Sequence, residues 1–301
     1  MIPEKNPSKV KRKDIQTMPL LSIVACRMLE DELVHVLSKD RELQQLIVVE
    51  NREISGFLRK LRSRNCNPKT AFLDRVPMLL KGHSSYDLRI TAGFLSSFPI
   101  FNRFCRKRKL GEEVSIVVNL LSLDLHADLD ILKTEVYRNI REMALFSDGV
   151  LIFYGICGHA LGKLEEDLAD LKCPLFFLKD RDGKTVEDCI SLSLGGNEAY
   201  ARVMTNFQGM GTIYLTPMWA SSWKQLENKN GSRDFNNRYL KNPLYCLAAK
   251  IDSGLVDDPD FHINVKEFAC TFDMKVVNLR GNLEITEQSY LNARNGRNEK
   301  Q

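Results

Sequence analysis

The stretch DGVLIFYGICGHALGKLEEDLADLKCPLFFLKD (148–180) holds two apolar runs on either side of a segment with helical spacing. We expect strands over 148–157 and 173–180, and a helix over 158–171 between them. A strand, a helix and a second strand in one short stretch predict a βαβ unit, in which the two strands are parallel. This stretch therefore favours an α/β protein built on a parallel sheet.

The alternation of strand and helix extends along the chain in both directions. Upstream, apolar runs predict strands at LLSIVA (20–25), QQLIVVEN (44–51) and VSIVVNLLSL (114–123), and helical spacing predicts helices within 26–40, 54–65 and 129–146. Downstream, we expect one helix led by glycines over 190–207, strands within 211–219, 244–254 and 272–281, and a helix near 265–272. Such alternation is typical of a doubly wound sheet.

We therefore predict a Rossmann-like, doubly wound and mostly parallel sheet with helices on both faces. The α/β domain is expected over residues 18–291, including an extra segment at 52–112. Residues 1–17 are basic and without period, which predicts a disordered tail. Residues 292–301 are rich in Asn and Arg, and we expect them to fray.

Composition narrows the class of protein. The 301 residues are 44% hydrophobic and carry a formal net charge of only +4, which gives no electrostatic case for binding nucleic acid. No apolar run is long enough to span a membrane, and the polar start has no signal-peptide core. We expect a cytoplasmic protein, in which cysteines stay reduced and serve in metal binding or catalysis rather than in disulfides.

Three of the eight cysteines follow strand-like runs. Cys26 comes directly after LLSIVA, Cys157 ends GVLIFYGI, and Cys189 lies in the loop beyond CPLFFLKD. The carboxyl ends of parallel strands meet at one crevice, where ligands usually bind. Thiols at three such ends predict a site for a soft metal or a metal cluster. The competing interpretation is that these cysteines are small apolar residues buried in the core.

Other polar side chains are expected near these thiols. His126 follows the strand VSIVVNLLSL, so its imidazole is a candidate fourth ligand, or alternatively a capping histidine. Asp188 either orients a ligand or caps the next helix. In the loop YGICGHALG, Gly155 and Gly158 leave room beside Cys157 for a cofactor, or only permit a tight turn.

The segments CRMLEDEL (26–33), YGICGHALG (154–162), EDCISLSLGGNEAY (187–200) and GTIYLTPMW (211–219), together with Leu125-His126, resemble the domain-of-unknown-function 1638 family over residues 19 to 290. Leu129 replaces a frequent proline of that family, and His159 a frequent asparagine. The polar positions that recur in the family correspond to Cys26, His126, Tyr154, Cys157, Asp188 and Cys189, with Thr216, Pro217 and Trp219 in the last segment.

The family is common in methanogens, and its members often lie near genes of corrinoid-dependent methyl transfer. The resemblance therefore implies a role in anaerobic one-carbon metabolism, with a corrinoid protein or a methyltransferase as partner and a corrinoid as candidate ligand. Zinc-bound thiolates suit methyl transfer, and a thiolate-held iron–sulfur cluster suits corrinoid reduction. We expect zinc or an iron–sulfur cluster on Cys26, Cys157, Cys189 and His126, in an open site lined by Tyr154, His159 and Trp219.

Two further interpretations of the same residues remain open. The crevice is alternatively a non-catalytic binding module for a corrinoid or a nucleotide-like ligand, although the loop at 154–162 does not match GxGxxG. A hydrolase that uses Cys157 with His126 is the third interpretation.

Overall fold

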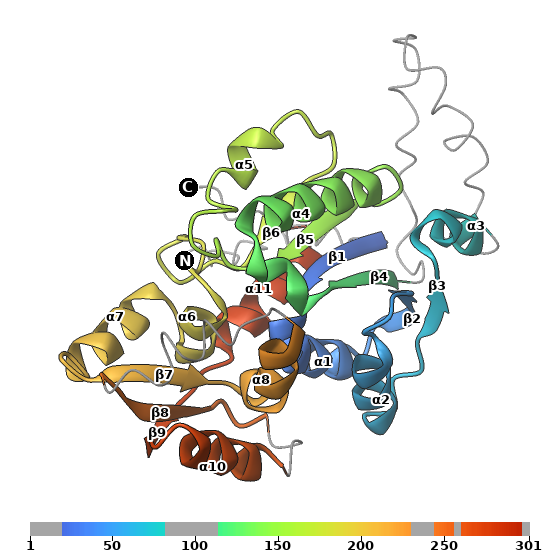
Figure 1. Ribbon diagram of the computed structural model, residues 1–301. Coiled ribbons are helices and arrows are strands. Elements are labelled where there is room, and N and C mark those ends of the chain that lie inside the picture. Colours follow the sequence, from blue (N-terminus) through green and yellow to red (C-terminus); the bar gives the residue numbers. More distant parts are fainter. Residues whose placement is uncertain (1–19, 82–113, 230–243, 256–259, 297–301) are drawn as a thin grey trace, which may run out of the picture.

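The computed structural model describes residues 20–81, 114–229, 244–255 and 260–296, and its strands form two parallel sheets (Figure 1). The larger sheet has the strand order β3-β2-β4-β1-β5-β6, and the smaller has the order β7-β8-β9. The α/β, Rossmann-like architecture predicted from the sequence is confirmed. Most of its strands lie in one sheet, as expected, but those beyond residue 210 form a sheet of their own. The basic tail expected at 1–17 lies outside the described residues.

The larger sheet contains the strands between residues 20 and 177. They are β1 (Leu20–Cys26), β2 (Leu43–Val49), β3 (Lys69–Ala71), β4 (Val114–Leu121), β5 (Gly149–Phe153) and β6 (Leu175–Phe177). The connecting helices are η1 (Arg27–Leu29), α1 (Glu30–Lys39), α2 (Ser55–Ser63), η2 (Leu73–Arg75), α3 (Val76–Lys81), η5 (Leu123–Ala127), α4 (Leu129–Ala144) and α5 (Leu164–Asp167). In Figure 1, α4 and α5 lie on one side of this sheet, and α1 and α2 lie on the other.

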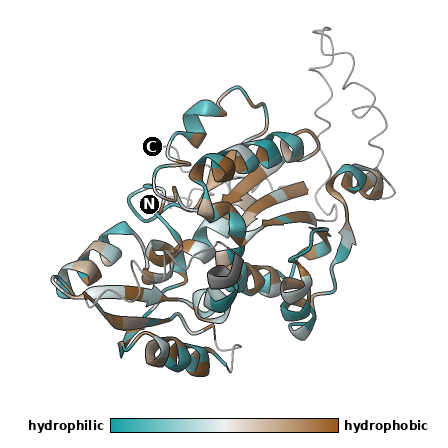
Figure 2. Ribbon diagram, viewed as in Figure 1, coloured by the Kyte–Doolittle hydropathy of each residue, from teal (hydrophilic) through white to brown (hydrophobic). Residues whose placement is uncertain are grey.

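The central strand β1 is buried along its whole length. It pairs in parallel with β4 on one side, where Cys26 is level with Leu121, and with β5 on the other, where Ala25 is level with Phe153. Its apolar side chains belong to the main core together with those of β2, β4 and β5. Figure 2 shows these strands as mostly hydrophobic, whereas the outward sides of the flanking helices are hydrophilic.

The connections that leave β1 and β4 run in opposite directions. The chain passes from β1 through α1 to β2, beyond β4, whereas it passes from β4 through α4 to β5, beyond β1. Such a reversal opens a crevice at the carboxyl ends of the two strands, the usual ligand position in open α/β sheets. Cys26 is the last residue of β1, and His126 lies in η5 just after β4.

The second half of the chain builds the smaller sheet and the last helix. Its elements are α6 (Cys189–Leu194), α7 (Asn197–Asn206), β7 (Gly211–Leu215), α8 (Pro217–Lys229), β8 (Tyr245–Asp252), α10 (Phe261–Thr271), β9 (Lys275–Arg280) and α11 (Glu284–Arg294). Side chains of α8 and α10 pack in one apolar cluster with Leu215 and Ala248, and those of α6 and α7 pack in another with Ile251. Trp219 packs against both clusters and against the main core.

Two expected helices differ from the structure. The helix expected over 158–171 cannot begin at its predicted start, because the backbone is left-handed at Cys157, Gly158 and His159, and only the four residues of α5 are α-helical. The helix expected over 190–207 is divided into α6 and α7 by Gly195 and Gly196, whose φ angles are +92° and +115°. Both interruptions come from positive φ, which no helix tolerates.

The sequence predicts fraying from residue 292 onward. In the structure α11 continues to Arg294 and packs against α1, β5 and β6, so residues 292–294 are helical. The buried Arg294 Nε lies 2.7 Å from Asp40 Oδ2, to which the Tyr290 hydroxyl also donates at 2.7 Å. Burial alone raises the pKa of Asp40, but the hydrogen bonds from Arg294 and Tyr290 outweigh it and hold the pKa below its usual value.

We expect Arg294→Met to lower the free energy of unfolding by about 3–5 kcal/mol, because it leaves a largely buried carboxylate without its cation. The loss should shrink as the pH falls below about 4 and through the lowered pKa of Asp40, since a carboxyl with a lowered pKa stabilises the fold only while it is ionised. Urea denaturation at pH 7 and at several pH values below about 4 measures both effects. Arg181→Met is the control; it removes an exposed ion pair with Glu284 of α11, which solvent screens, and should leave the stability nearly unchanged. Equal losses in the free energy of unfolding for the two variants would contradict the conclusion that the buried Arg294–Asp40 pair stabilises the fold.

Candidate functional site

Cys26 lies at the point where β1 turns into η1. Its side chain is 3% exposed, and its Sγ is 3.7 Å from His126 Nε2. Burial raises the pKa of the Cys26 thiol well above its usual value, and electrostatic repulsion from Cys157 and Cys189 adds to that effect, while hydrogen bonds with the backbone of Met28 and Leu29 oppose it. Cys26 is thus close enough to Cys157 and Cys189 for their charges to affect its ionisation.

His126 approaches the same thiol from the next strand. Ser122 caps η5 by accepting a hydrogen bond from the Asp124 amide, and this turn brings the imidazole of His126 over Cys26. The His126 ring stacks on Tyr154, with centroids 6.2 Å apart and planes 14° from parallel. Desolvation of the ring lowers the pKa of His126, although a hydrogen bond with the Leu123 backbone opposes the shift. A neutral imidazole keeps the lone pair that a metal ligand needs.

Cys157 lies in a strained loop after β5. Its φ angle is +45°, and those of Gly158 and His159 are +65° and +71°. Positive φ is uncommon in residues other than glycine, and such strain concentrates at functional sites. The loop is held by backbone hydrogen bonds from Ile156 to the Val186 carbonyl and from Cys157 to the Glu187 carbonyl, at 3.0 and 2.8 Å. These bonds place Cys157 beside the segment that carries Cys189.

Gly155 permits this approach of the two segments. A Cβ atom at this position would lie 2.7 Å from both the backbone nitrogen and the Cα of Asp188. No side chain fits there, so the glycine is required by the close contact and not by a turn. One interpretation of the sequence was that Gly155 leaves room for a cofactor beside Cys157. In the structure the backbone of Asp188 occupies the space next to Gly155.

We expect Gly155→Ala to separate Cys157 from Cys189 and to abolish shared metal binding, because backbone atoms cannot yield to the added methyl group. Gly162→Ala in the same loop is the control, since its nearest contact would be an ordinary 3.4 Å to the His159 carbonyl. Metal content after purification and thermal melting measure the two effects. Full retention of metal in Gly155→Ala would show that the close approach does not position the thiols.

Cys189 is the first residue of α6. Asp188 caps this helix by accepting a hydrogen bond from the Ser191 amide at 2.7 Å, so the capping role considered for it is confirmed. Burial raises the pKa of the Cys189 thiol strongly, and the charge of Asp188 adds to that effect. For Cys157, burial and then Asp188 raise the thiol pKa to about 12. Both groups are neutral thiols in the absence of a cation.

The structure thus brings Cys26, His126, Cys157 and Cys189 into one neighbourhood at the carboxyl edge of the larger sheet. Within the described ranges, no group of three or more His, Cys, Asp and Glu side chains surrounds a single position as the ligands of one metal ion do. A tetrahedral ion with bonds of ~2.3 Å needs sulfurs about 4 Å apart. The expected mutual distance of the three sulfurs therefore stays a prediction.

Two buried hydrogen-bond donors lie beside the thiols. Tyr154 is 1% exposed; burial raises its pKa well above the usual value, and the charge of Cys26 and a hydrogen bond with its thiol add to that effect. The indole Nε1 of Trp219 is also buried, and its hydrogen bond with Cys189 opposes the rise that burial causes in the pKa of that thiol. Sulfur is a weak acceptor, so these two contacts are weaker than hydrogen bonds to oxygen.

The remaining expected residues lie at the rim. Gly158 and His159 are exposed, and Leu129 at the start of α4 packs next to Gly158, 3.7 Å from where a Cβ would lie. The left-handed backbone of Gly158 and His159 carries the chain outward after Cys157. His159 therefore stands at the mouth of the candidate site and not among the sulfurs.

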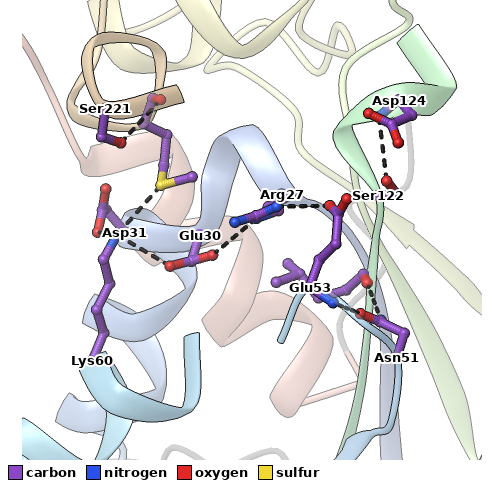
Figure 3. A network of polar contacts seen from close by, with 11 residues as sticks. Arg27, Glu30, Asp31, Asn51, Glu53, Lys60, Ser122, Asp124 and Ser221 are labelled. Atoms are coloured by element: carbon purple, nitrogen blue, oxygen red, sulfur yellow. Dashed lines mark hydrogen bonds and ion pairs between the residues drawn. The ribbon is translucent and has the colours of Figure 1, made fainter. Parts of the chain in front are cut away.

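Sequence reasoning missed a network of charged side chains beside Cys26, which Figure 3 shows from close by. Arg27 lies between Glu30 and Glu53, and Lys60 lies between Glu30 and Asp31. Glu30 and Asp31 lie in the first turn of α1, where acidic residues complement the helix dipole. Glu30 is only 2% exposed, however, and its position three and four residues before Leu33 and Val34 puts it on the buried face of the helix.

This network connects the two ends of the candidate site. Arg27 directly follows Cys26, and Lys60 Nζ is 3.3 Å from the sulfur of Met218, the residue before Trp219. Removing one partner of a buried ion pair leaves the other charge uncompensated, so the network resists displacement. It fixes the start of α1, and with it the backbone of Met28 and Leu29 that faces Cys26.

Fold and site together define an α/β protein in which three cysteines and a histidine gather at the switch point of a parallel sheet. A family model described as a protein of unknown function, DUF1638, matches residues 120–290. The chain belongs to this family, as the sequence motifs indicated. No curated protein and no solved structure matches the chain. In the part of the chain that the structure describes, no helix has the length and apolar character needed to cross a bilayer.

Proposed function

We propose that Cys26, Cys157 and Cys189, with His126, form a metal centre that takes part in corrinoid-dependent methyl transfer in the cytoplasm. The observation that carries the metal centre is the convergence of three thiols and an imidazole at the switch-point crevice. Each side chain comes from a different connection of the chain. Convergence of this kind is hard to obtain from cysteines that serve only as small apolar residues.

The electrostatics of the site support a bound cation. The pKa values of all three thiols are raised by burial, and mutual repulsion contributes for Cys26 and Cys189. Thiols in such surroundings ionise only when a cation compensates the charge, and thiolate is the form that binds zinc or iron. When bound, the metal supplies either activation of a thiol or the transfer of an electron.

The residues around the thiols have defined tasks in this proposal. Tyr154 orients the imidazole of His126 by stacking, and Asp188 holds the start of α6 so that Cys189 faces Cys157. His159 and Leu129 at the rim are placed to meet a bulky ligand or a partner protein. The link to a corrinoid protein or a methyltransferase rests on the family resemblance alone.

Substitution of individual cysteines tests the ligand set. We expect Cys26→Ser, Cys157→Ser and Cys189→Ser each to lower bound metal sharply in anaerobically purified protein, measured by elemental analysis. Protein variants with Ser at one of the cysteines elsewhere in the described residues should retain metal. These cysteines are Cys66, Cys173, Cys246 and Cys270. Cys105, outside the described residues, is expected to behave like them. Equal metal content in all eight variants would remove the assignment.

Removal of the metal tests whether the centre is functional or structural. The six-stranded sheet has a large apolar core of its own, so we expect a chelator to leave a folded protein that regains metal afterwards. Circular dichroism and thermal melting report the fold, and a visible-absorption titration with a corrinoid reports binding before and after reloading. Collapse of the whole fold would indicate a structural metal. Corrinoid binding that is unaffected by the metal would instead favour a non-catalytic binding module.

A further inference from the structure

A pocket lies at the carboxyl edge of the smaller sheet. Its volume of about 610 Å³ is within the range of small-molecule sites. The pocket is lined by the ends of α6, β8 and β9 and by the turns that follow the two strands: Leu194, Asp252, Ser253, Gly254, Arg280, Gly281, Asn282 and Leu283. Ligands of parallel sheets usually bind outside the carboxyl ends of the strands. The pocket has the position of a ligand site, and its lining includes no residue of the proposed metal centre.

Backbone contacts fix the shape of this pocket. The Gly281 amide donates a hydrogen bond to the Asp252 carbonyl at 2.7 Å, and the Asn282 amide donates one to the Ser193 carbonyl at 2.8 Å. A Cβ atom at Gly281 would lie only 2.7 Å from the Cα of Ser253, so the turns after β8 and β9 meet where no side chain fits. The pocket is therefore formed by the main chain, and a ligand does not have to order it first.

Two opposite charges lie side by side in this pocket without neutralising each other. Asp252 and Arg280 are the last residues of β8 and β9, and the parallel register puts them level with each other. The carboxylate of Asp252 instead accepts a hydrogen bond from the Gly254 amide at 3.0 Å and lies 3.8 Å from Lys250 Nζ. Among the described residues, no side chain forms an ion pair with the exposed Arg280. Its guanidinium is therefore available to an external anion.

We propose that this pocket binds a small molecule that carries an oxyanion group, phosphate or carboxylate, together with a hydroxyl group. Arg280 pairs with the oxyanion, because the planar guanidinium fork matches two oxygens of a phosphate or a carboxylate. The side chain of Asp252 is 61% exposed, and its carboxylate accepts a hydrogen bond from the hydroxyl group. The same negative charge disfavours an anion without a hydroxyl group, so Asp252 makes the pocket selective.

Titration with defined probes tests the ligand class. The full chain is titrated by isothermal calorimetry at fixed ionic strength with ribose 5-phosphate, gluconate, ribose and inorganic phosphate. We expect saturable binding of ribose 5-phosphate or gluconate, which carry both groups, and about tenfold weaker binding of ribose and inorganic phosphate. The tighter of the first two probes identifies the oxyanion. No binding of either at millimolar concentration, or equal affinity for all four probes, would overturn the proposal.

Substitutions at the two charged residues locate the bound probe. Arg280→Met should weaken binding of the two-group probe about tenfold, because the ion pair is lost. Asp252→Asn keeps an acceptor for the Gly254 amide; it should weaken the two-group probe but strengthen inorganic phosphate, because a repelling charge is removed. Lys275→Met is the matched control, since it removes an exposed cation at the other end of β9. Unchanged affinity in Arg280→Met, or equal weakening in Lys275→Met, would overturn the assigned site.

Discussion

Parallel pairing of the buried strand β1 with β4 on one side and β5 on the other is the constraint on which the rest of the structure depends. Because β1 is central, its last residue is surrounded by the carboxyl ends of both neighbours. Connections that leave β1 and β4 in opposite directions keep this place free of a crossing chain. Cys26 thus lies at the one edge position that side chains from several strands can reach.

The candidate site is held together by backbone contacts more than by side chains. Gly155 lets the segment after β5 run against Asp188, and two hydrogen bonds fix the register of the two segments. The charged network of Arg27, Glu30 and Lys60 then fixes the start of α1 from the other side. Positions of the thiols are therefore determined by the main chain, which suits a site whose ligands must keep one geometry.

Short-range patterns in the sequence were sufficient for all strands of the structure except the three-residue β3, for the parallel fold class and for the neighbourhood of Cys26, His126, Cys157 and Cys189. Apolar runs and strand ends carry that information locally. The division into two sheets was not predictable, since strand spacing is the same within one sheet and between two. The burial of Glu30 depends on Lys60, thirty residues later in the sequence. Likewise, the contacts of Tyr154 with Cys26 and of Trp219 with Cys189 are visible only once their three-dimensional surroundings are known.

The last helix completes the core of the first sheet. Ile285, Tyr290 and Ala293 of α11 belong to the same apolar cluster as β1, and the Tyr290 hydroxyl reaches Asp40 across 250 residues of chain. During synthesis the ribosome releases the first sheet long before this helix exists. The β1–β4–β5 core must wait with an apolar face uncovered, and contacts so distant in sequence form slowly. The nascent chain is therefore a natural client for chaperones, and the core of the larger sheet is complete only after α11 has left the ribosome.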